Sequence, residues 1–230
     1  MTDAPTDASL PVKRKRGRPA GRTPLQEESL RQTRAAILGA TASLLSSKTY
    51  VETTIDDIIR TAGIGRTTFY LHFESKFALA IAIVDSIATD WHELFLELAA
   101  IPARDIEKLI AWIATLSDLY IDHGYVSQLA VQLPVFEPKF EERLQKDRND
   151  LIDLLGQAGV GGFAIAARTP AGEPLSRERA QAHLLLVRLD RLCHDFSRGL
   201  LWSAEDMAIQ VRLVAEELSA FLSLPATRRA

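Results

Sequence analysis

The segment Arg66-Thr67-Thr68 combines side chains that can recognise the edges of DNA bases. An arginine guanidinium can donate two hydrogen bonds to a guanine, and the methyl group of a threonine can contact the methyl group of thymine. Donors suited to phosphate oxygens follow within the next ten residues, at Tyr70, His72 and Lys76. Phosphate contacts fix the position of a protein on DNA without specifying the sequence. If one exposed helix holds these side chains, they form a surface that can read DNA.

The residues before this segment predict a short helix that ends in a tight turn. Thr54 can cap this helix by accepting a hydrogen bond from a backbone N–H, and Asp57 is its partner in a capping box. Its buried face is predicted to consist of Ile55, Ile58 and Ile59. Gly63 suits the left-handed conformation that often follows a helix end. A second helix over residues 66–73 completes a helix-turn-helix pattern.

The second helix has two faces of different character. Phe69 and Phe73 lie four residues apart, on one face, and are expected to anchor the helix to the core. The other face is polar. Because the major groove is about 12 Å wide, it admits one helix that presents polar side chains to the bases. Arg66 stands at the N-terminal end, where a recognition helix normally enters the groove.

Residues 54–79 resemble the DNA-binding signature of the TetR (tetracycline-repressor) family. The resemblance lies in Ala-Gly-Ile in the turn, Thr-Phe-Tyr-Leu-His-Phe in the second helix and the Ser-Lys that follows, and with the preceding helix it covers residues 31–84. It implies base and phosphate contacts from Arg66, Thr67, Thr68 and Tyr70, and contacts to the DNA backbone from Thr54, His72 and Lys76. Gly65 departs from the family pattern, since many relatives have a serine cap there, but glycine is an acceptable cap.

The N-terminal stretch is basic on an otherwise acidic chain. Residues 1–76 carry 12 Lys and Arg against 8 Asp and Glu, a net charge of +4, whereas residues 77–230 carry 15 against 22, a net charge of −7. Residues 15–22 resemble an AT-hook, whose Arg-Gly-Arg-Pro core enters a narrow minor groove. We expect a disordered arm that contacts DNA through Lys15, Arg16, Arg18 and Arg22. A merely solvated basic tail is the alternative.

Helical periodicity continues through the rest of the chain. A long helix is expected over residues 76–98, and further helices over residues 106–121, 136–155, 176–201 and 203–222. The last two carry regular apolar stripes, such as Leu185, Leu189, Leu192 and Phe196. Two such helices in antiparallel succession form half of a four-helix bundle, so residues 176–222 are predicted to pair with a second copy of the chain. Residues 156–174 are expected to form a long surface loop.

These patterns predict an all-α fold with two domains. Residues 1–27 would form the disordered arm, residues 28–76 a three-helix helix-turn-helix domain, and residues 77–224 a helical domain for effector binding and dimerisation. An effector pocket would be largely apolar with a few polar groups. Its expected lining residues are Trp112, Tyr120, His123 and Tyr125. An ordinary hydrophobic core is the alternative role for these aromatic residues.

Two other features are given structural interpretations. Residues 159–164 match a Gly-x-Gly-x-x-Ala fingerprint, but a helix is predicted before them where a dinucleotide site requires a strand, so a loop is the better interpretation. Cys193 adjoins His194, yet neighbours on a helix point about 100° apart, which favours a buried small residue over a reactive thiol. No catalytic set, metal site or cofactor is predicted, and the protein is not expected to be an enzyme.

The sequence therefore predicts a DNA-binding transcriptional regulator that acts as a homodimer in the cytoplasm. No membrane span is predicted, because the uncharged runs are too short. The resemblance implies a repressor that a small molecule releases from a palindromic operator. One alternative is an architectural protein that holds A·T-rich DNA mainly through its arm. The other is an enzyme or ligand carrier in which the helix-turn-helix pattern is a coincidence. The sequence does not identify the operator or the effector.

Overall fold

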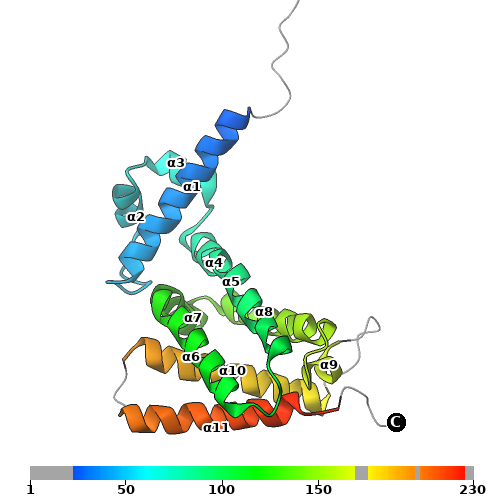
Figure 1. The fold of residues 1–230 in the computed structure, drawn as a ribbon. Coiled ribbons are helices and arrows are strands. Elements are labelled where there is room, and N and C mark those ends of the chain that lie inside the picture. The colour runs from blue at the N-terminus through cyan, green and yellow to red at the C-terminus, as the bar shows by residue number, and fades with distance from the viewer. Residues whose placement is uncertain (1–22, 169–175, 200–202, 226–230) are drawn as a thin grey trace, which may run out of the picture.

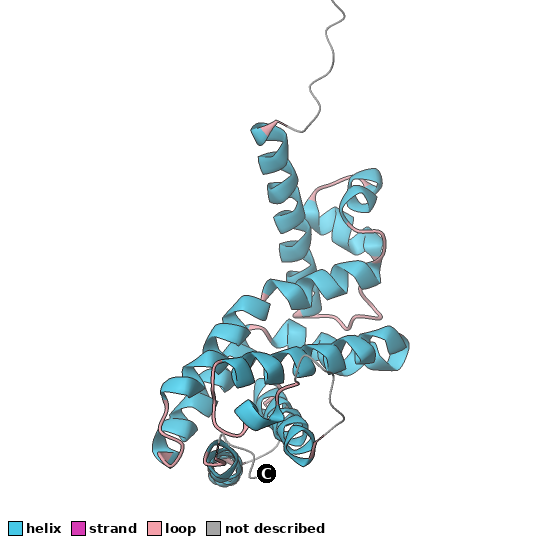
Figure 2. Cartoon of the chain, turned by 90° about the vertical axis from the view of Figure 1, so that its right-hand side faces the viewer, coloured by secondary structure: helices cyan, strands magenta, loops and turns pink. Residues whose placement is uncertain are grey.

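The computed structural model describes residues 23–168, 176–199 and 203–225, and all regular elements in these ranges are helices (Figures 1 and 2). The predicted all-α fold is therefore confirmed. The four arm residues Lys15, Arg16, Arg18 and Arg22 lie outside the described residues. None of the helices in these ranges is both long enough and apolar enough to cross a membrane.

The N-terminal domain consists of a long helix followed by the helix-turn-helix. Its elements are α1 (Pro24–Leu45), α2 (Ile55–Ala62) and α3 (Arg66–His72). Helix α1 begins earlier than the expected residue 28, because Thr23 and Gln26 form a capping box and Pro24 occupies the first turn. Proline suits that position, since its missing N–H would have had no partner there.

The predicted caps of the helix-turn-helix are confirmed. The Thr54 side chain accepts from the Asp57 N–H, and the Asp57 side chain accepts from the Thr54 N–H. Gly63 ends α2 with φ 67°, a left-handed conformation that glycine adopts without steric cost. Gly65 caps α3 without any side-chain hydrogen bond. The turn between α2 and α3 is thus set by local chemistry.

The prediction of a single helix over residues 76–98 is wrong. The chain instead forms α4 (Lys76–Ser86), α5 (Ala88–Leu96) and the short 3-10 helix η1 (Glu97–Ala100). The break lies at Ile87, whose backbone has φ −106° and ψ −1°. The Ser86 hydroxyl donates to the Ile83 carbonyl at 2.7 Å, and serine bonds of this kind compete with the helix ladder.

The C-terminal domain contains the remaining helices, α6 (Ile106–Asp122), α7 (Gly124–Phe136), α8 (Pro138–Gln157), α9 (Phe163–Ala166), α10 (Arg177–Ser197) and α11 (Ala204–Leu222). The helices expected over 106–121, 176–201 and 203–222 correspond to α6, α10 and α11. Helix α7 was not predicted. Helices α10 and α11 run along one another at the end of the molecule opposite α2 and α3 (Figure 1).

Two hydrophobic cores hold the molecule together. One lies in the C-terminal domain between α6, α8, α10 and α11. The other contains Ile58, Phe69 and Leu79 from the helix-turn-helix and α4, together with Leu129 and Leu133 from α7. The core of the DNA-binding domain therefore extends across the domain boundary expected at residue 76. Helix α7 connects this domain physically to the rest of the chain.

The described part of the stretch expected to be a long surface loop, residues 156–168, packs against α11 instead. Val160, Phe163 and Ala166 are buried. The Gly162 N–H donates to the Phe221 carbonyl at 3.1 Å, and a Cβ on Gly161 would lie 2.3 Å from the Leu222 carbonyl oxygen. These glycines therefore permit close approach of two backbones. Their segment follows helix α8, which agrees with the rejection of a dinucleotide fingerprint.

Candidate DNA-binding surface and effector pocket

Helix α3 presents a polar face to solvent and an aromatic face to the core. Phe69 is fully buried and Phe73 nearly so. Arg66 and Thr67 are exposed, Thr68 is half-buried, and Tyr70 remains 47% exposed. The predicted anchors and the predicted base-reading residues thus lie on opposite faces of one helix. This is the arrangement that a recognition helix needs.

An acidic side chain holds the arginine of this surface. The Arg66 Nη1 donates to the Asp56 Oδ1 at 2.8 Å, across the turn between α2 and α3. Both side chains are more than half exposed. Exposed ion pairs are weak, on the order of 0–1 kcal/mol, so base edges can compete for the guanidinium.

Two of the residues expected to contact the DNA backbone already have partners within the protein. The Lys76 Nζ donates to the Tyr50 and Thr53 carbonyls at 2.9 and 3.0 Å and lies 4.1 Å from the centre of the Tyr50 ring. Burial lowers the pKa of Lys76. The Thr54 hydroxyl is occupied by Asp57. Lys76 therefore holds the loop before α2, and His72 is half-buried at the end of α3.

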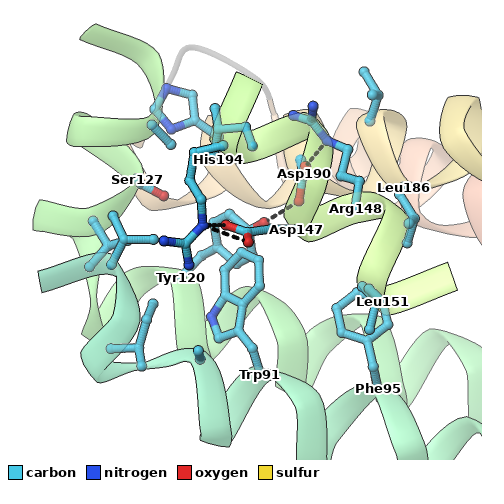
Figure 3. A pocket seen from close by; sticks show the side chains of 18 of the residues that line it. Trp91, Phe95, Tyr120, Ser127, Asp147, Arg148, Leu151, Leu186, Asp190 and His194 are labelled. Atoms are coloured by element: carbon cyan, nitrogen blue, oxygen red, sulfur yellow. Dashed lines mark hydrogen bonds and ion pairs between the residues drawn. The ribbon is translucent and has the colours of Figure 1, made fainter. Parts of the chain in front are cut away.

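A pocket of about 330 Å³ lies among α4, α5, α7, α8 and α10 (Figure 3). This volume falls at the lower end of the range for small-molecule sites, roughly 300–1,000 Å³. The walls are mainly apolar, and they include Val84, Ile87, Trp91, Phe95, Val126, Leu151 and Leu186. Helix α5 contributes one wall of the pocket, and α4 ends at its edge.

A hydrogen-bonded network forms the polar part of the lining. The Tyr120 hydroxyl donates to the Asp190 Oδ1 at 2.5 Å, and the Arg148 Nε donates to the Asp190 Oδ2 at 3.3 Å (Figure 3). Burial, together with the nearby Asp190 charge, raises the pKa of Tyr120 well above its ordinary value. Arg143 binds both Asp85 and Asp147. The network joins α6, α8 and α10 around the cavity.

Only one of the four expected pocket residues lines this cavity. That residue is Tyr120. The Trp112 indole N–H donates to the Leu94 carbonyl at 2.9 Å inside the C-terminal core. His123 and Tyr125 bind each other at 3.0 Å and are not part of the lining. Apolar pocket walls and apolar cores look alike in a sequence, so aromatic residues alone did not separate them.

Polar lining residues that were not predicted include Trp91, Ser127 and His194. Ser127 lies on α7, the helix that was not predicted. Cys193, the neighbour of His194, is fully buried and faces Ser117, and burial raises its pKa to about 12. The interpretation of Cys193 as a buried small residue therefore agrees with its surroundings.

The outer surface of α10 and α11 carries large apolar side chains. Leu184 and Val187 on α10 are 66% and 45% exposed, and Ile209 and Leu213 on α11 are 53% and 59% exposed. We call these four residues the bundle face, of which Val187 also lines the pocket. The regular apolar stripe of α10 does not belong to this surface, because Leu185, Leu189 and Leu192 are buried in the chain's own core. A second apolar face thus remains for a partner.

Comparison with known proteins shows what the chain resembles. The model of the family described as bacterial regulatory proteins, tetR family, matches residues 37–83. An uncharacterised HTH-type transcriptional regulator of Lactococcus lactis is 27% identical over 70% of this chain and 86% of its own length. The HTH-type transcriptional regulator EthR of Mycobacterium tuberculosis is 32% identical, over 48% of this chain and 47% of its own.

Structural similarity extends the likeness to the whole fold. The transcriptional regulator FadR of Bacillus subtilis, solved with stearoyl-CoA, has a TM-score of 0.56 with 14% identity, over 82% of this chain and 97% of its own. The matched family segment contains α2, α3 and most of α4. Residues 37–83 of this chain therefore match the tetR family in sequence, and the overall helical fold is similar to that of FadR.

Proposed function

We propose that this protein is a homodimeric transcriptional repressor, working in the cytoplasm, that leaves its DNA operator when a small molecule binds. The observation that carries the proposal is the exposed polar face of α3, fixed from behind by buried Phe69 and Phe73. Arg66 and Thr67 would contact base edges, with Thr68 beside them. Tyr70, His72 and the start of α2 at Thr54 would contact phosphates.

The bundle face supplies the dimer. Four exposed large apolar side chains on two adjacent helices are unfavourable in water, and pairing with a second copy removes them from solvent. Two copies related by a twofold axis present two α3 helices. Half-sites for such dimers lie about 34–36 Å apart, or at multiples of that distance, so the operator would be palindromic. The basic arm would add contacts in the adjacent minor groove.

Release of DNA would follow from the position of the pocket. Helix α5 forms a pocket wall, and α4, which precedes it, packs against the core of the DNA-binding domain. A ligand that fits the pocket better when α4 is displaced would favour the arrangement that does not bind DNA. The FadR structure with stearoyl-CoA supports this role, because a related fold there holds a small molecule.

The test is selection of bound fragments from a random DNA pool by the full-length protein at about 150 mM salt. Arg66→Ala is selected in parallel, and Arg104→Ala is the matched control. Arg104 is an exposed arginine between η1 and α6, outside the helix-turn-helix, so its loss changes the net charge equally. We expect a palindromic motif from the wild type and the control, and loss of that motif from Arg66→Ala.

The architectural alternative predicts a different result. Enrichment of A·T-rich fragments without symmetry, unchanged in Arg66→Ala, would contradict the repressor proposal. In that case the affinity would depend mainly on salt-dependent phosphate contacts and would be largely lost when residues 1–24 are removed. An absence of any enrichment would instead favour the ligand carrier with a coincidental helix-turn-helix.

A further inference from the structure

We propose that the effector of this pocket is a neutral, mostly apolar molecule that carries a carbonyl-type hydrogen-bond acceptor. The inference rests on the proposed function, since it assigns a chemical class to the ligand of the same site. It is argued from a comparison of two kinds of polar group in the lining: those that have a hydrogen-bond or ion-pair partner within the protein, and those that have none among the described residues.

Three polar side chains that line the pocket leave polar atoms without a hydrogen-bond partner among the described residues. They are the Trp91 Nε1, the Ser127 Oγ and both ring nitrogens of His194, and these atoms are shielded from solvent. The Ser127 and His194 residues are each only 6% exposed. A buried polar group without a partner is costly, on the order of 1–3 kcal/mol, so such groups on residues that line one cavity point to a ligand-binding site.

The unpartnered groups favour an acceptor on the ligand. The Trp91 indole N–H can only donate. Burial lowers the pKa of His194, with Arg198 adding to the effect, which leaves a neutral ring with one donor and one acceptor. The Ser127 hydroxyl can take either role. A carbonyl oxygen has two lone pairs, and therefore it can satisfy two of the three donors at once.

The arginines and aspartates of the lining already take part in ion pairs within the protein. The pocket contains three arginines and three aspartates, and each arginine has an acidic partner: Arg143 with Asp85 and Asp147, Arg148 with Asp190, and Arg191 with Asp195. An anionic ligand would have to displace an aspartate before it could bind an arginine. A cationic ligand would meet aspartates whose charges are already neutralised. Ligands without a charge avoid both costs.

The rest of the lining and its size complete the description. The walls around Trp91, Phe95, Leu151 and Leu186 are apolar, so they suit a hydrocarbon or aromatic body (Figure 3). The volume of about 330 Å³ suits a compact molecule. Esters, ketones and lactones of modest size meet all of these requirements. A free carboxylate or amine of the same length does not.

The experiment compares three probes with matched apolar tails: 2-decanone, decanoate and decylammonium. Binding to the full-length protein is followed by the rise in Tm and by calorimetry, because a ligand of the folded state raises Tm. We expect 2-decanone to bind at least about tenfold more tightly than either ion. Trp91→Phe and Ser127→Ala should each weaken 2-decanone roughly three- to tenfold, the loss of one hydrogen bond.

Ser117→Ala is the matched control. Ser117 is 5% exposed and therefore as buried as Ser127, which is 6% exposed. However, its hydroxyl donates to the Ile113 carbonyl at 2.8 Å, and Ser117 does not line the pocket. This variant should bind 2-decanone as the wild type does. Tighter binding of decanoate or decylammonium, no binding of any probe, or an equal loss in Ser117→Ala would each overturn the proposal.

A separate measurement distinguishes this inference from the proposed function. DNA release is followed by fluorescence anisotropy of a labelled operator while 2-decanone is added. Binding of the ketone without release would leave the ligand class intact and contradict the effector mechanism. Specific DNA binding by a protein that takes up only decanoate would leave the regulator intact and refute the ligand class.

Discussion

The Nη1 of Arg66 lies 2.8 Å from the Oδ1 of Asp56, which joins the first residue of α3 to the first turn of α2. The contact orients the arginine before DNA arrives, and it places a negative charge beside a surface that must approach phosphates. Asp56 therefore opposes DNA binding in general and restrains the arginine that would read a base.

Asp56→Ala should strengthen binding to DNA of any sequence and reduce discrimination. An exposed pair is worth at most ~1 kcal/mol, so the gain on unrelated duplexes should be up to about fivefold. The gain on the operator should be smaller, because Arg66 loses its orientation. Anisotropy titrations of operator and scrambled duplexes at two salt concentrations measure the ratio. An unchanged ratio would show that Asp56 does not orient Arg66.

Lys76→Met should destabilise the fold rather than affect DNA contacts directly. The substitution removes the ammonium, so the Tyr50 and Thr53 carbonyls lose their donor and the Tyr50 ring loses its cation, which corresponds to about 1–3 kcal/mol. Urea unfolding followed by circular dichroism measures the loss. If stability stayed constant while operator affinity fell, Lys76 would be the phosphate contact that the family resemblance implies.

Leu213→Asp should dissociate the dimer. Leu213 is 59% exposed in the single chain and belongs to the bundle face, so the dimer would bury the new aspartate charge, and we expect the dimer Kd to rise by at least about tenfold. Sedimentation velocity measures the change. Leu25→Asp is the control, because Leu25 is 80% exposed at the start of α1, away from the bundle face. Equal dissociation in both variants would argue against this interface.

Asp153→Asn should remove the partner of a buried cation. Arg179 is 5% exposed, and its Nη1 donates to the Asp153 Oδ1 at 2.8 Å and to the Ala166 carbonyl at 3.0 Å. We expect a loss of about 3 kcal/mol in the free energy of unfolding. Asp150→Asn, one turn earlier on α8, removes only exposed ion pairs and should change stability by less than about 1 kcal/mol.

The same carboxylate makes stability depend on acidic pH. Burial raises the pKa of Asp153, but hydrogen bonds from the Arg168 backbone and from the Arg179 and Arg168 side chains outweigh burial and lower it. Because the folded pKa lies below the unfolded value of about 3.9, the contribution is complete above that pH and is lost as the pH falls through the folded pKa. Unfolding curves below about pH 4 should therefore decline less steeply in Asp153→Asn. Parallel declines would contradict this assignment.

The helix-turn-helix could be predicted because its determinants are local. The caps at Thr54 and Gly63 and the spacing of Phe69 and Phe73 depend only on near neighbours. The break at Ile87 could not be predicted in this way, because helical periodicity continues across it. At this break the Ser86 hydroxyl bonds back to the Ile83 carbonyl of its own helix. The most regular apolar stripe, Leu185, Leu189 and Leu192, packs inside the chain's own core, so periodicity did not reveal the exposed residues of the bundle face.

The residues that line the pocket could not be predicted, because the sequence does not show which buried polar groups find a partner in the fold. Ser117 and Ser127 are both buried serines on neighbouring helices, yet one hydroxyl has a carbonyl partner and the other has none. Only the three-dimensional arrangement separates them. Trp91 and Trp112 differ in the same manner, because only Trp112 has an acceptor for its indole N–H.

The break at Ile87 also separates two roles: one helix supports the DNA-binding domain and the next one lines the pocket. Helix α4 packs on the DNA-binding domain, whereas α5 carries Trp91 and Phe95 into the pocket. Trp91 also packs against the core of the DNA-binding domain, whereas Phe95 belongs to the C-terminal core, so mutations at Phe95 can change which molecule is recognised without disturbing the contacts of the helix-turn-helix. The same separation gives protein engineers a place to alter the inducer of this regulator while keeping its operator.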